Sequence, residues 1–415
     1  MTETEERPLH EVPSADGRRE KGQRGRRWGE DGPRRDVVAE VSKVVRDLAG
    51  TTCEGPRDAL VARLTAAGAF GLTADGGSGS EVLADSVARV LLLVARLSPS
   101  IAQVVQTHYS ALSALARYVR LDGTRPRDLP SGRYVQLQSE PTGATGSAVS
   151  STLRRTPEGL RLDGVKDYAT GIEWAERLNV GARFEGRKVQ IVLPRSVRGV
   201  SVDPTWSAFG QQDTESHRVE LKDVPVDPGS VFVPDGMPQS PLTKLAHAAI
   251  DIGIGESAMD SFRSFLLHDG RLRNAAASAG AETVLDDPYV RRQFGYGSVE
   301  LSVLRARLFE LAAIIDGTSS PRTASEGVPA ARAVDPDIGL EIQIRAFAAY
   351  AGETAVKLAS ELFSNAGARA ARLDRQLDAY WRDARVHTLL NPRDWSLSEL
   401  GRAILSERIS DDETD

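Results

Sequence analysis

The spacing of apolar residues changes twice along this chain, and this change constrains the fold more than any other feature. Apolar side chains recur at helical spacing before about residue 130 and again from about residue 241, whereas residues 132–238 contain short runs in which apolar and polar side chains alternate. A period near 3.6 is typical of helices, and a period of two is typical of strands. The sequence therefore predicts an α+β fold in which strands lie between two helical regions.

The first helical region opens with an apolar stripe behind Asp36, the expected N-cap. The stripe consists of Val37, Val38, Val41, Val44, Val45 and Leu48. Further helices are expected at 58–67, at 81–97 and from Pro99 onward. The second helical region contains four long stretches, near 243–268, 288–315, 335–366 and 375–390, and a short helix near 397–405. Long helices with short connections favour an antiparallel four-helix bundle.

Strands are expected between these regions, near 134–138, 150–155, 160–168, 177–184, 188–193, 200–202 and 218–221. Strands spaced this closely favour a compact β-barrel. The predicted division is a disordered tail (1–36), an N-terminal helical domain (37–130), a β-barrel domain (131–238), a C-terminal helical bundle (239–408) and an acidic tail (409–415). The first tail is predicted to be disordered because it nearly lacks large apolar side chains.

Composition excludes several classes of function. The net charge of -6, from 58 acidic and 52 basic side chains, argues against a general nucleic-acid binder. No apolar run reaches the ~18 residues of a membrane span. The single cysteine, Cys53, excludes an internal disulfide and fits a reducing cytoplasm. The histidines contain no pair spaced i, i+4, so no metal site is expected. We expect a cytoplasmic protein that binds neither membranes nor nucleic acid.

Charged residues are embedded among apolar ones in the stretch 380–392, which reads Tyr-Trp-Arg-Asp-Ala-Arg-Val-His-Thr-Leu-Leu-Asn-Pro. Part of the charge of Arg382, Asp383 and Arg385 is expected to lie against the protein. Because buried charge is costly unless it is paired, a charge network is predicted here. Pro392 cannot continue a helix, so the backbone is expected to turn shortly after His387.

The residues from His387 to Pro392 resemble the His-Thr-Leu-His-Asp-Pro turn of the oxygenase branch of the acyl-CoA dehydrogenase superfamily. That branch includes the dibenzothiophene monooxygenases and the sulfur-acquisition oxygenases. Here Leu390 and Asn391 replace the second His and the Asp. The resemblance covers nearly everything after residue 36. It implies an N-terminal helical domain, a central β-barrel, a C-terminal four-helix bundle, and a homo-oligomer that is either a dimer or a tetramer.

Two earlier segments resemble motifs that contact the flavin ring in this superfamily. Ser139-Glu140-Pro141 is similar to Thr-Glu-Pro, and Tyr168-Ala169-Thr170-Gly171 is similar to Trp/Phe-x-Thr/Ser-Gly/Asn. In the family the aromatic ring packs on the isoalloxazine, and a hydroxyl or backbone N–H contacts its N5. The resemblance implies that the ring is bound by Ser139, Tyr168, Ala169, Thr170 and Gly171.

Two later segments resemble motifs at the phosphate end of the flavin. Residues 291–295, Arg-Arg-Gln-Phe-Gly, are similar to Arg-x-x-Phe-Gly, which reaches the phosphate across a subunit boundary. Arginine suits this task because its planar fork binds two oxygens at once. Residues 363–367 match a segment that usually reads Gly-Gly-x-Gly, but only the last glycine is present. The resemblance implies that Arg291, Phe294, Asn365 and Gly367 contact the cofactor, and the weak match favours FMN over FAD.

Dehydrogenases of this superfamily use a Glu as base at one of two positions, which correspond here to Asn391 and Thr243. Neither side chain can take a proton as a carboxylate does. The resemblance therefore favours a two-component monooxygenase, which would take reduced FMN (or FAD) from a separate flavin reductase. It would use O₂ to oxygenate N, S or C in a small organic substrate of natural-product or sulfur metabolism. An acyl-CoA dehydrogenase with a displaced base and a non-catalytic flavin-fold binding protein remain as alternatives.

The resemblance also implies roles for side chains near the reacting centre. Thr170 and His387 are the predicted catalytic hydrogen-bond donors, and His108 is the next catalytic candidate. Trp206 precedes Gly210-Gln211 as the pocket Trp of the oxygenase branch does. Trp206, His108 and Asn391 are therefore the predicted substrate-binding residues.

Overall fold

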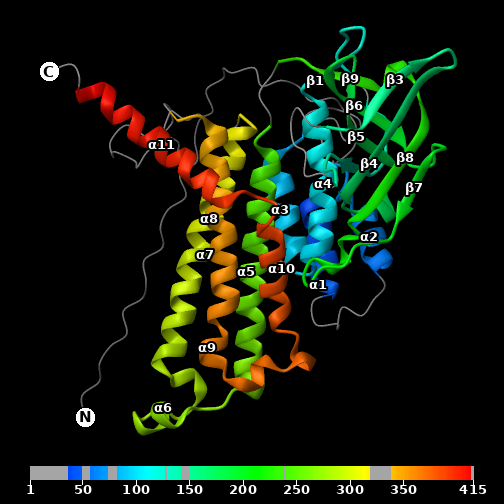
Figure 1. Ribbon diagram of the computed structural model, residues 1–415. Helices are drawn as coiled ribbons and strands as arrows, with labels where there is room; N and C mark the ends of the chain where they lie inside the picture. The colour runs from blue at the N-terminus through cyan, green and yellow to red at the C-terminus, as the bar shows by residue number, and fades with distance from the viewer. Residues whose placement is uncertain are drawn as a thin grey trace, which may run out of the picture. The chain divides into compact units, whose positions relative to one another are not determined.

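A computed structural model describes residues 36–48, 57–72, 82–126, 129–141, 149–236, 240–317 and 338–412. From Asp36 onward the chain forms one unit, in which a curled sheet lies beside helices and further long helices pack together (Figure 1). The tail predicted at 1–36 lies outside the described residues except for its last member. Asp36 Oδ1 accepts a hydrogen bond from the N–H of Ala39 at 3.0 Å, which confirms the predicted N-cap.

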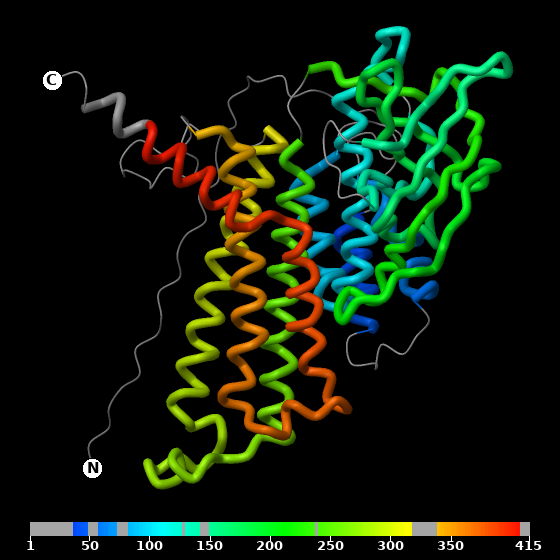
Figure 2. The backbone as a smooth tube through the Cα atoms, viewed as in Figure 1, coloured from blue at the N-terminus to red at the C-terminus, as the bar shows by residue number. Residues whose placement is uncertain are grey.

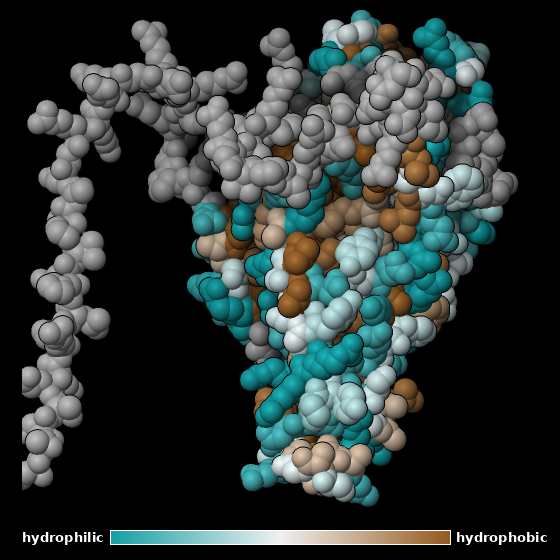
Figure 3. All heavy atoms as spheres, turned by 90° about the vertical axis from the view of Figure 1, so that its left-hand side faces the viewer, coloured by the Kyte–Doolittle hydropathy of each residue, from teal (hydrophilic) through white to brown (hydrophobic). Residues whose placement is uncertain are grey.

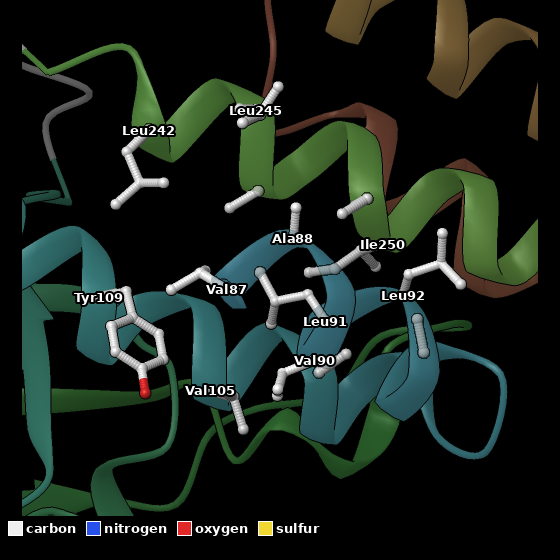
Figure 4. Close-up of a cluster of buried hydrophobic side chains, with 14 of the residues drawn as sticks. Val87, Ala88, Val90, Leu91, Leu92, Val105, Tyr109, Leu242, Leu245 and Ile250 are labelled. Carbon is white, nitrogen blue, oxygen red and sulfur yellow. The ribbon is translucent and has the colours of Figure 1, made fainter. Parts of the chain in front are cut away.

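The helices before the sheet are α1 (Val37–Leu48), α2 (Arg57–Ala66), α3 (Ala84–Ala95) and α4 (Pro99–Leu115). α4 begins at the predicted proline, and Ser98 caps it by accepting from the N–H of Ile101 at 3.3 Å. Figure 4 shows the core that these helices share with the start of α5, where Ile250 lies beside Leu91 and Leu92 of α3. This packing fixes α4 between the sheet and the long helices.

The strands are β1 (Tyr118–Arg120), β2 (Tyr134–Leu137), β3 (Thr152–Thr156), β4 (Gly159–Ala169), β5 (Arg177–Phe184), β6 (Arg187–Pro194), β7 (Val200–Asp203), β8 (His217–Val226) and β9 (Val231–Pro234). In the described part of the chain their order is β1-β9-β6-β5-β3-β4-β8-β7, and β2 pairs with β5 in parallel. The predicted strands are present. β1 and β9, with 3 and 4 residues, were not predicted.

The helices after the sheet are α5 (Leu242–Asp269), α6 (Asn274–Ser278), α7 (Pro288–Ile315), α8 (Leu340–Glu361), α9 (Phe363–Ala366), α10 (Asp378–Thr388) and α11 (Arg393–Asp412). α5 contacts α7, α8 and α10 along its length, and Figure 2 follows α10 as it returns beside α5. The stretch predicted as one helix over 335–366 is divided at Leu362, and its first residues lie outside the described part. None of the described helices combines the length and the apolar character needed to cross a membrane.

Candidate active site

The end of β4 and the turn after it are strained and present an exposed aromatic ring. Tyr168 has a φ of 59°, a left-handed conformation that is unusual for a bulky residue, and its side chain is 62% exposed. Gly171 has a φ of 80°, and a Cβ atom there would lie 2.8 Å from Cγ1 of Val104 on α4. The turn is therefore held by close packing on α4, and strain of this kind is concentrated at functional sites.

A buried ion pair fixes Ser139 beside this turn. Lys166 Nζ lies 2.7 Å from Glu140 Oε1, and both side chains are 0% exposed. Glu140 also accepts hydrogen bonds from the N–H and hydroxyl groups of Ser150 and Ser151. Burial raises the pKa of the Glu140 carboxyl, but Lys166 and these serine donors outweigh it and hold the pKa far below its usual range. The backbone N–H of Asp167 donates to the carbonyl of Ser139 at 3.1 Å, so the two predicted flavin-ring segments lie side by side.

The predicted pocket tryptophan lies against the same turn. The rings of Tyr168 and Trp206 meet edge to face with centroids 6.3 Å apart. Trp206 Nε1 donates to the carbonyl of Gln211 at 3.0 Å, which fixes the indole. Ser139, Tyr168 and Trp206 thus come from three segments and gather at one end of the sheet.

A chain of hydroxyl groups runs from Thr170 to Gln211, and its direction is fixed. Thr214 Oγ1 donates to the carbonyl of Gln211 at 2.8 Å, because a carbonyl can only accept. Thr214 must therefore accept from Ser216, whose Oγ lies 2.8 Å away, and Ser216 must accept from Thr170 at 2.9 Å. The Thr170 hydroxyl therefore donates its hydrogen to Ser216, within the protein. Thr170 was predicted as a donor, but this geometry leaves it only lone pairs to offer a ligand.

The same loop is anchored on α10. The N–H of Gln211 donates to Asp383 Oδ1 at 2.6 Å, and Arg382 donates to the carbonyl of Phe209 at 2.8 Å. Burial raises the pKa of Asp383 to about 6, although the N–H of Gln211 and the charge of Arg382 lower it. The predicted network around Arg382 and Asp383 is therefore present, and it ties the Thr170 turn to the helix that carries His387.

His387 is buried against a carboxylate from α5. Its Nδ1 lies 2.7 Å from Asp251 Oδ1, and the two side chains are 0% and 1% exposed. Nδ1 donates, because an ionised carboxylate can only accept. Burial raises the pKa of Asp251, and the neighbouring His387 opposes this shift. In the described part of the chain, Nε2 of His387 is buried without a hydrogen-bond partner. The imidazole is therefore oriented at one nitrogen and free at the other.

The predicted substrate residue Asn391 belongs to the same group. Its Oδ1 accepts from Lys244 Nζ and lies 3.4 Å from His247 Nδ1. The ring of His247 meets that of His387 edge to face at 5.2 Å. Burial lowers the pKa of His247 well below its ordinary value, so this imidazole is neutral. Thr243, the other position considered for a base, donates to Ser110 Oγ on α4 at 3.0 Å.

His108 occupies a different environment. Its Nε2 lies 3.1 Å from the carbonyl of Phe70, and its Nδ1 accepts from the N–H of Tyr134 at 3.1 Å. Burial lowers the pKa of His108 to about 4, against a smaller opposing effect of the Phe70 carbonyl. The ring lines a cavity of about 250 Å³ that also contains Arg133 and Glu176. Both ring nitrogens are thus engaged by the backbone, and the catalytic role of His108 stays a prediction.

The residues predicted at the phosphate end gather elsewhere in the chain. Arg291 binds Asp286 at 2.6 Å, and Asn365 donates to Gln293 Oε1 at 2.6 Å, which places Phe294 and Gly367 in the same neighbourhood. This group lies near the last turn of α5, where Arg369 and Arg375 pair with Asp269. Since α5 has 28 residues, its two ends are about 40 Å apart. Within one chain, Arg291, Phe294, Asn365 and Gly367 do not share a site with His387 and Asn391.

Asp251, His247 and Lys244 are site residues that the sequence prediction missed. Their signal was present, because His247 and Asp251 are spaced i, i+4 in the otherwise apolar run from Leu245 to Gly255. Polar side chains on a fully buried helix need partners, so such a pair indicates a polar site. Among the described residues, no group of three or more His, Cys, Asp or Glu side chains could hold a metal ion.

Comparison with known proteins identifies the class of this fold. A family model described as "Acyl-CoA dehydrogenase, C-terminal domain" matches residues 245–392. A probable FMNH₂-dependent monooxygenase, SfnC, from Pseudomonas putida is 27% identical over 88% of this chain and 91% of its own length. A dibenzothiophene monooxygenase from Mycolicibacterium goodii is 25% identical over 60% of this chain and 62% of its own length.

A solved structure has the same fold over nearly the whole chain. TdsC from Paenibacillus sp. A11-2, in complex with FMN and indole, superposes with a TM-score of 0.73 and 23% identity over 90% of this chain and 96% of that one. Residues 245–392 are thus similar to the C-terminal domain of acyl-CoA dehydrogenases. Curated relatives carry the names of an FMNH₂-dependent monooxygenase and of dibenzothiophene monooxygenases, which confirms the resemblance to the oxygenase branch.

Proposed function

We propose that this chain is the oxygenase component of a two-component flavin-dependent monooxygenase. It binds reduced flavin made by a separate reductase and uses O₂ to oxygenate N, S or C in a small organic substrate. The observation that carries the proposal is at Asn391. The position considered for a dehydrogenase base holds an amide whose oxygen is occupied by Lys244, while the acid beside it, Asp251, is committed to His387.

The turn after β4 fits a reduced flavin ring. Tyr168 and Trp206 supply an aromatic surface, with the ring of Tyr168 held away from the protein. Thr170 offers only lone pairs, and a reduced flavin has a ring N–H where the oxidised ring has an acceptor. When bound, the flavin supplies the electrons that activate oxygen. Ser139, Ala169 and Gly171 complete the proposed ring site, together with Tyr168 and Thr170.

His387 is the proposed proton carrier of the reaction. Asp251 fixes the tautomer and orientation of the ring through Nδ1, as a carboxylate does for a catalytic histidine. Nε2 can then hold a proton and return it inside a site shielded from water. Asn391 and Trp206 are the proposed substrate contacts.

FMN is the proposed flavin. A longer cofactor such as FAD would be bound by Arg291, Phe294, Asn365 and Gly367. These residues lie at the far end of α5, so they can contact only the flavin of a neighbouring copy of the chain. A homo-oligomer, a dimer or tetramer, is therefore part of the proposal. Figure 3 shows apolar residues on the face formed by the later helices. The exposed apolar residues of α7, α8 and α11 include Val299, Val303, Tyr350, Trp395 and Leu405. We also propose that the chain is divided into an N-terminal helical domain (37–130), a β-barrel domain (131–238) and a C-terminal four-helix bundle (239–408).

Reduced FMN and O₂ test the proposal directly. We expect the protein to bind reduced FMN more tightly than oxidised FMN, and to give a transient near-ultraviolet absorbance when the reduced complex meets O₂. Bleaching of oxidised flavin by an acyl-CoA would instead identify a dehydrogenase. A protein that binds flavin but leaves its reaction with O₂ unchanged would be a binding module.

A further inference from the structure

We propose that Lys244 is the recognition group for an anion carried by the substrate, such as a carboxylate, sulfinate or sulfonate. This inference rests on the proposed monooxygenase function and narrows its substrate class. The site consists of Lys244, His247 and Asn391 at the ends of α5 and α10.

Among the residues that the structure describes, none forms an ion pair with Lys244. Its ammonium group donates to the neutral amide oxygen of Asn391, and no carboxylate of a described residue lies within ion-pair distance. The side chain is partly buried. Burial lowers the pKa of Lys244, and the charge of Arg345 lowers it further, against a weaker opposing effect of Glu341. A cation held in this way is costly unless something compensates it.

Glu341 acts on Lys244 only through its charge, and two further acids, Asp251 and Glu399, are bound to other partners. Asp251 binds His387 at 2.7 Å, and Glu399 binds Arg345 at 3.0 Å. His247 is neutral because burial lowers its pKa. The group around Asn391 therefore presents hydrogen-bond donors and positive charge, which is the complement of an anionic ligand.

The anion site and the Thr170 turn lie along the same helix. Val104 of α4 packs against Gly171, and Ser110 of α4 accepts from Thr243, the neighbour of Lys244. Val104 and Ser110 are about 9 Å apart along the helix axis. A small molecule whose anion binds Lys244 can thus extend along α4 toward the Thr170 turn. The substrate is therefore a small molecule that carries an anion at one end.

Anion binding by the full chain loaded with FMN tests this directly. The probes are methanesulfinate, benzenesulfinate and benzoate, each compared with a neutral analogue: dimethyl sulfone, methyl phenyl sulfone and benzamide. We expect at least one anion to raise the midpoint of thermal unfolding and to bind about tenfold or more tightly to wild type than to Lys244→Met. The control is Lys222→Met, since Lys222 is exposed on β8 and does not belong to the group around Asn391. Lys222→Met should bind like wild type.

A second measurement needs no variant. Because an anion restores the pKa of Lys244 toward its ordinary value, binding at pH 9 should take up protons, which makes the calorimetric heat depend on the buffer. No anion-dependent shift in wild type, equal binding by Lys244→Met, or equal binding of neutral analogues overturns the inference. The reaction of reduced FMN with O₂ is followed separately in the same proteins. Its loss in wild type would remove the monooxygenase proposal without touching the anion result.

Discussion

His387 donates its Nδ1 hydrogen to Asp251 across 2.7 Å, with both side chains excluded from solvent. The two residues are 136 positions apart and come from α10 and α5. The carboxylate holds one nitrogen of the ring, so the other nitrogen has a fixed direction and can exchange a proton. This relationship separates the chain from an enzyme whose carboxylate itself abstracts a proton.

Asp251→Asn tests the role of the carboxylate. The amide keeps an acceptor of the same shape for Nδ1 but removes the negative charge beside the ring. We expect the near-ultraviolet transient formed with reduced FMN and O₂ to decay with a rate changed on the order of 10²-fold, and its pH dependence to shift. Stopped-flow absorbance measures both without a substrate.

Asp260→Asn is the matched control for this change, because Asp260 lies on the same helix but is exposed and pairs with Arg96. It should leave the decay rate and its pH profile unchanged. An Asp251→Asn protein with the wild-type pH profile would show that the carboxylate is structural only.

Thr214→Val tests the direction of the hydroxyl chain. The change removes the hydroxyl that accepts a hydrogen bond from Ser216. Ser216 can then donate to Thr170, and the Thr170 hydroxyl can donate to a ligand. We expect the affinity for oxidised FMN to rise relative to that for reduced FMN by about fivefold, the value of one ordinary hydrogen bond. Titration with FMN in both redox states measures the ratio, and Thr152→Val, an exposed hydroxyl on β3, is the control. An unchanged ratio would contradict the assigned direction.

Long elements were predictable from the sequence because their periodicity is strong. α7 begins and ends at the predicted residues, and β5 does the same. The break at Leu362 could not be read, since the apolar pattern continues through it. β1 and β9 show no alternation in the sequence, and they form through pairing in the fold, β1 with β9 and β9 with β6.

Site residues that follow a family motif were predictable, whereas those that act through pairing were not. Ser139, Tyr168 and Trp206 were predicted from short sequence motifs, and they lie together in the structure. Glu140 lies within one of these motifs, but its contact with Lys166 depends on two segments that meet only in the fold. The direction of the Thr170 chain depends on the turn at Gln211, whose left-handed φ of 53° no sequence pattern indicated.

Asp383→Asn should remove a pH dependence of stability. The pKa of Asp383 is raised from 3.8 to about 6, chiefly by burial. The folded state therefore binds this proton more tightly, so the stabilising contribution is complete below about pH 4 and is lost as pH rises to 6. Above pH 6 the charged carboxylate costs at most about 3 kcal/mol. Denaturant unfolding at pH 5 and pH 8 should show a smaller decrease for the variant than for wild type. An identical decrease would contradict the raised pKa.

The Lys166–Glu140 pair gives the largest expected effect on stability. Lys166→Met leaves Glu140 charged and buried beside Ser150 and Ser151, and breaking a buried pair in this way costs about 3–5 kcal/mol. Glu140→Gln combined with Lys166→Met removes both charges, so we expect the double variant to recover part of that loss. Thermal unfolding of the single and double variants measures the coupling. Because the pair also positions Ser139 beside Tyr168, Lys166→Met should weaken FMN binding as well. Additive effects of the two changes would mean that the two side chains contribute independently.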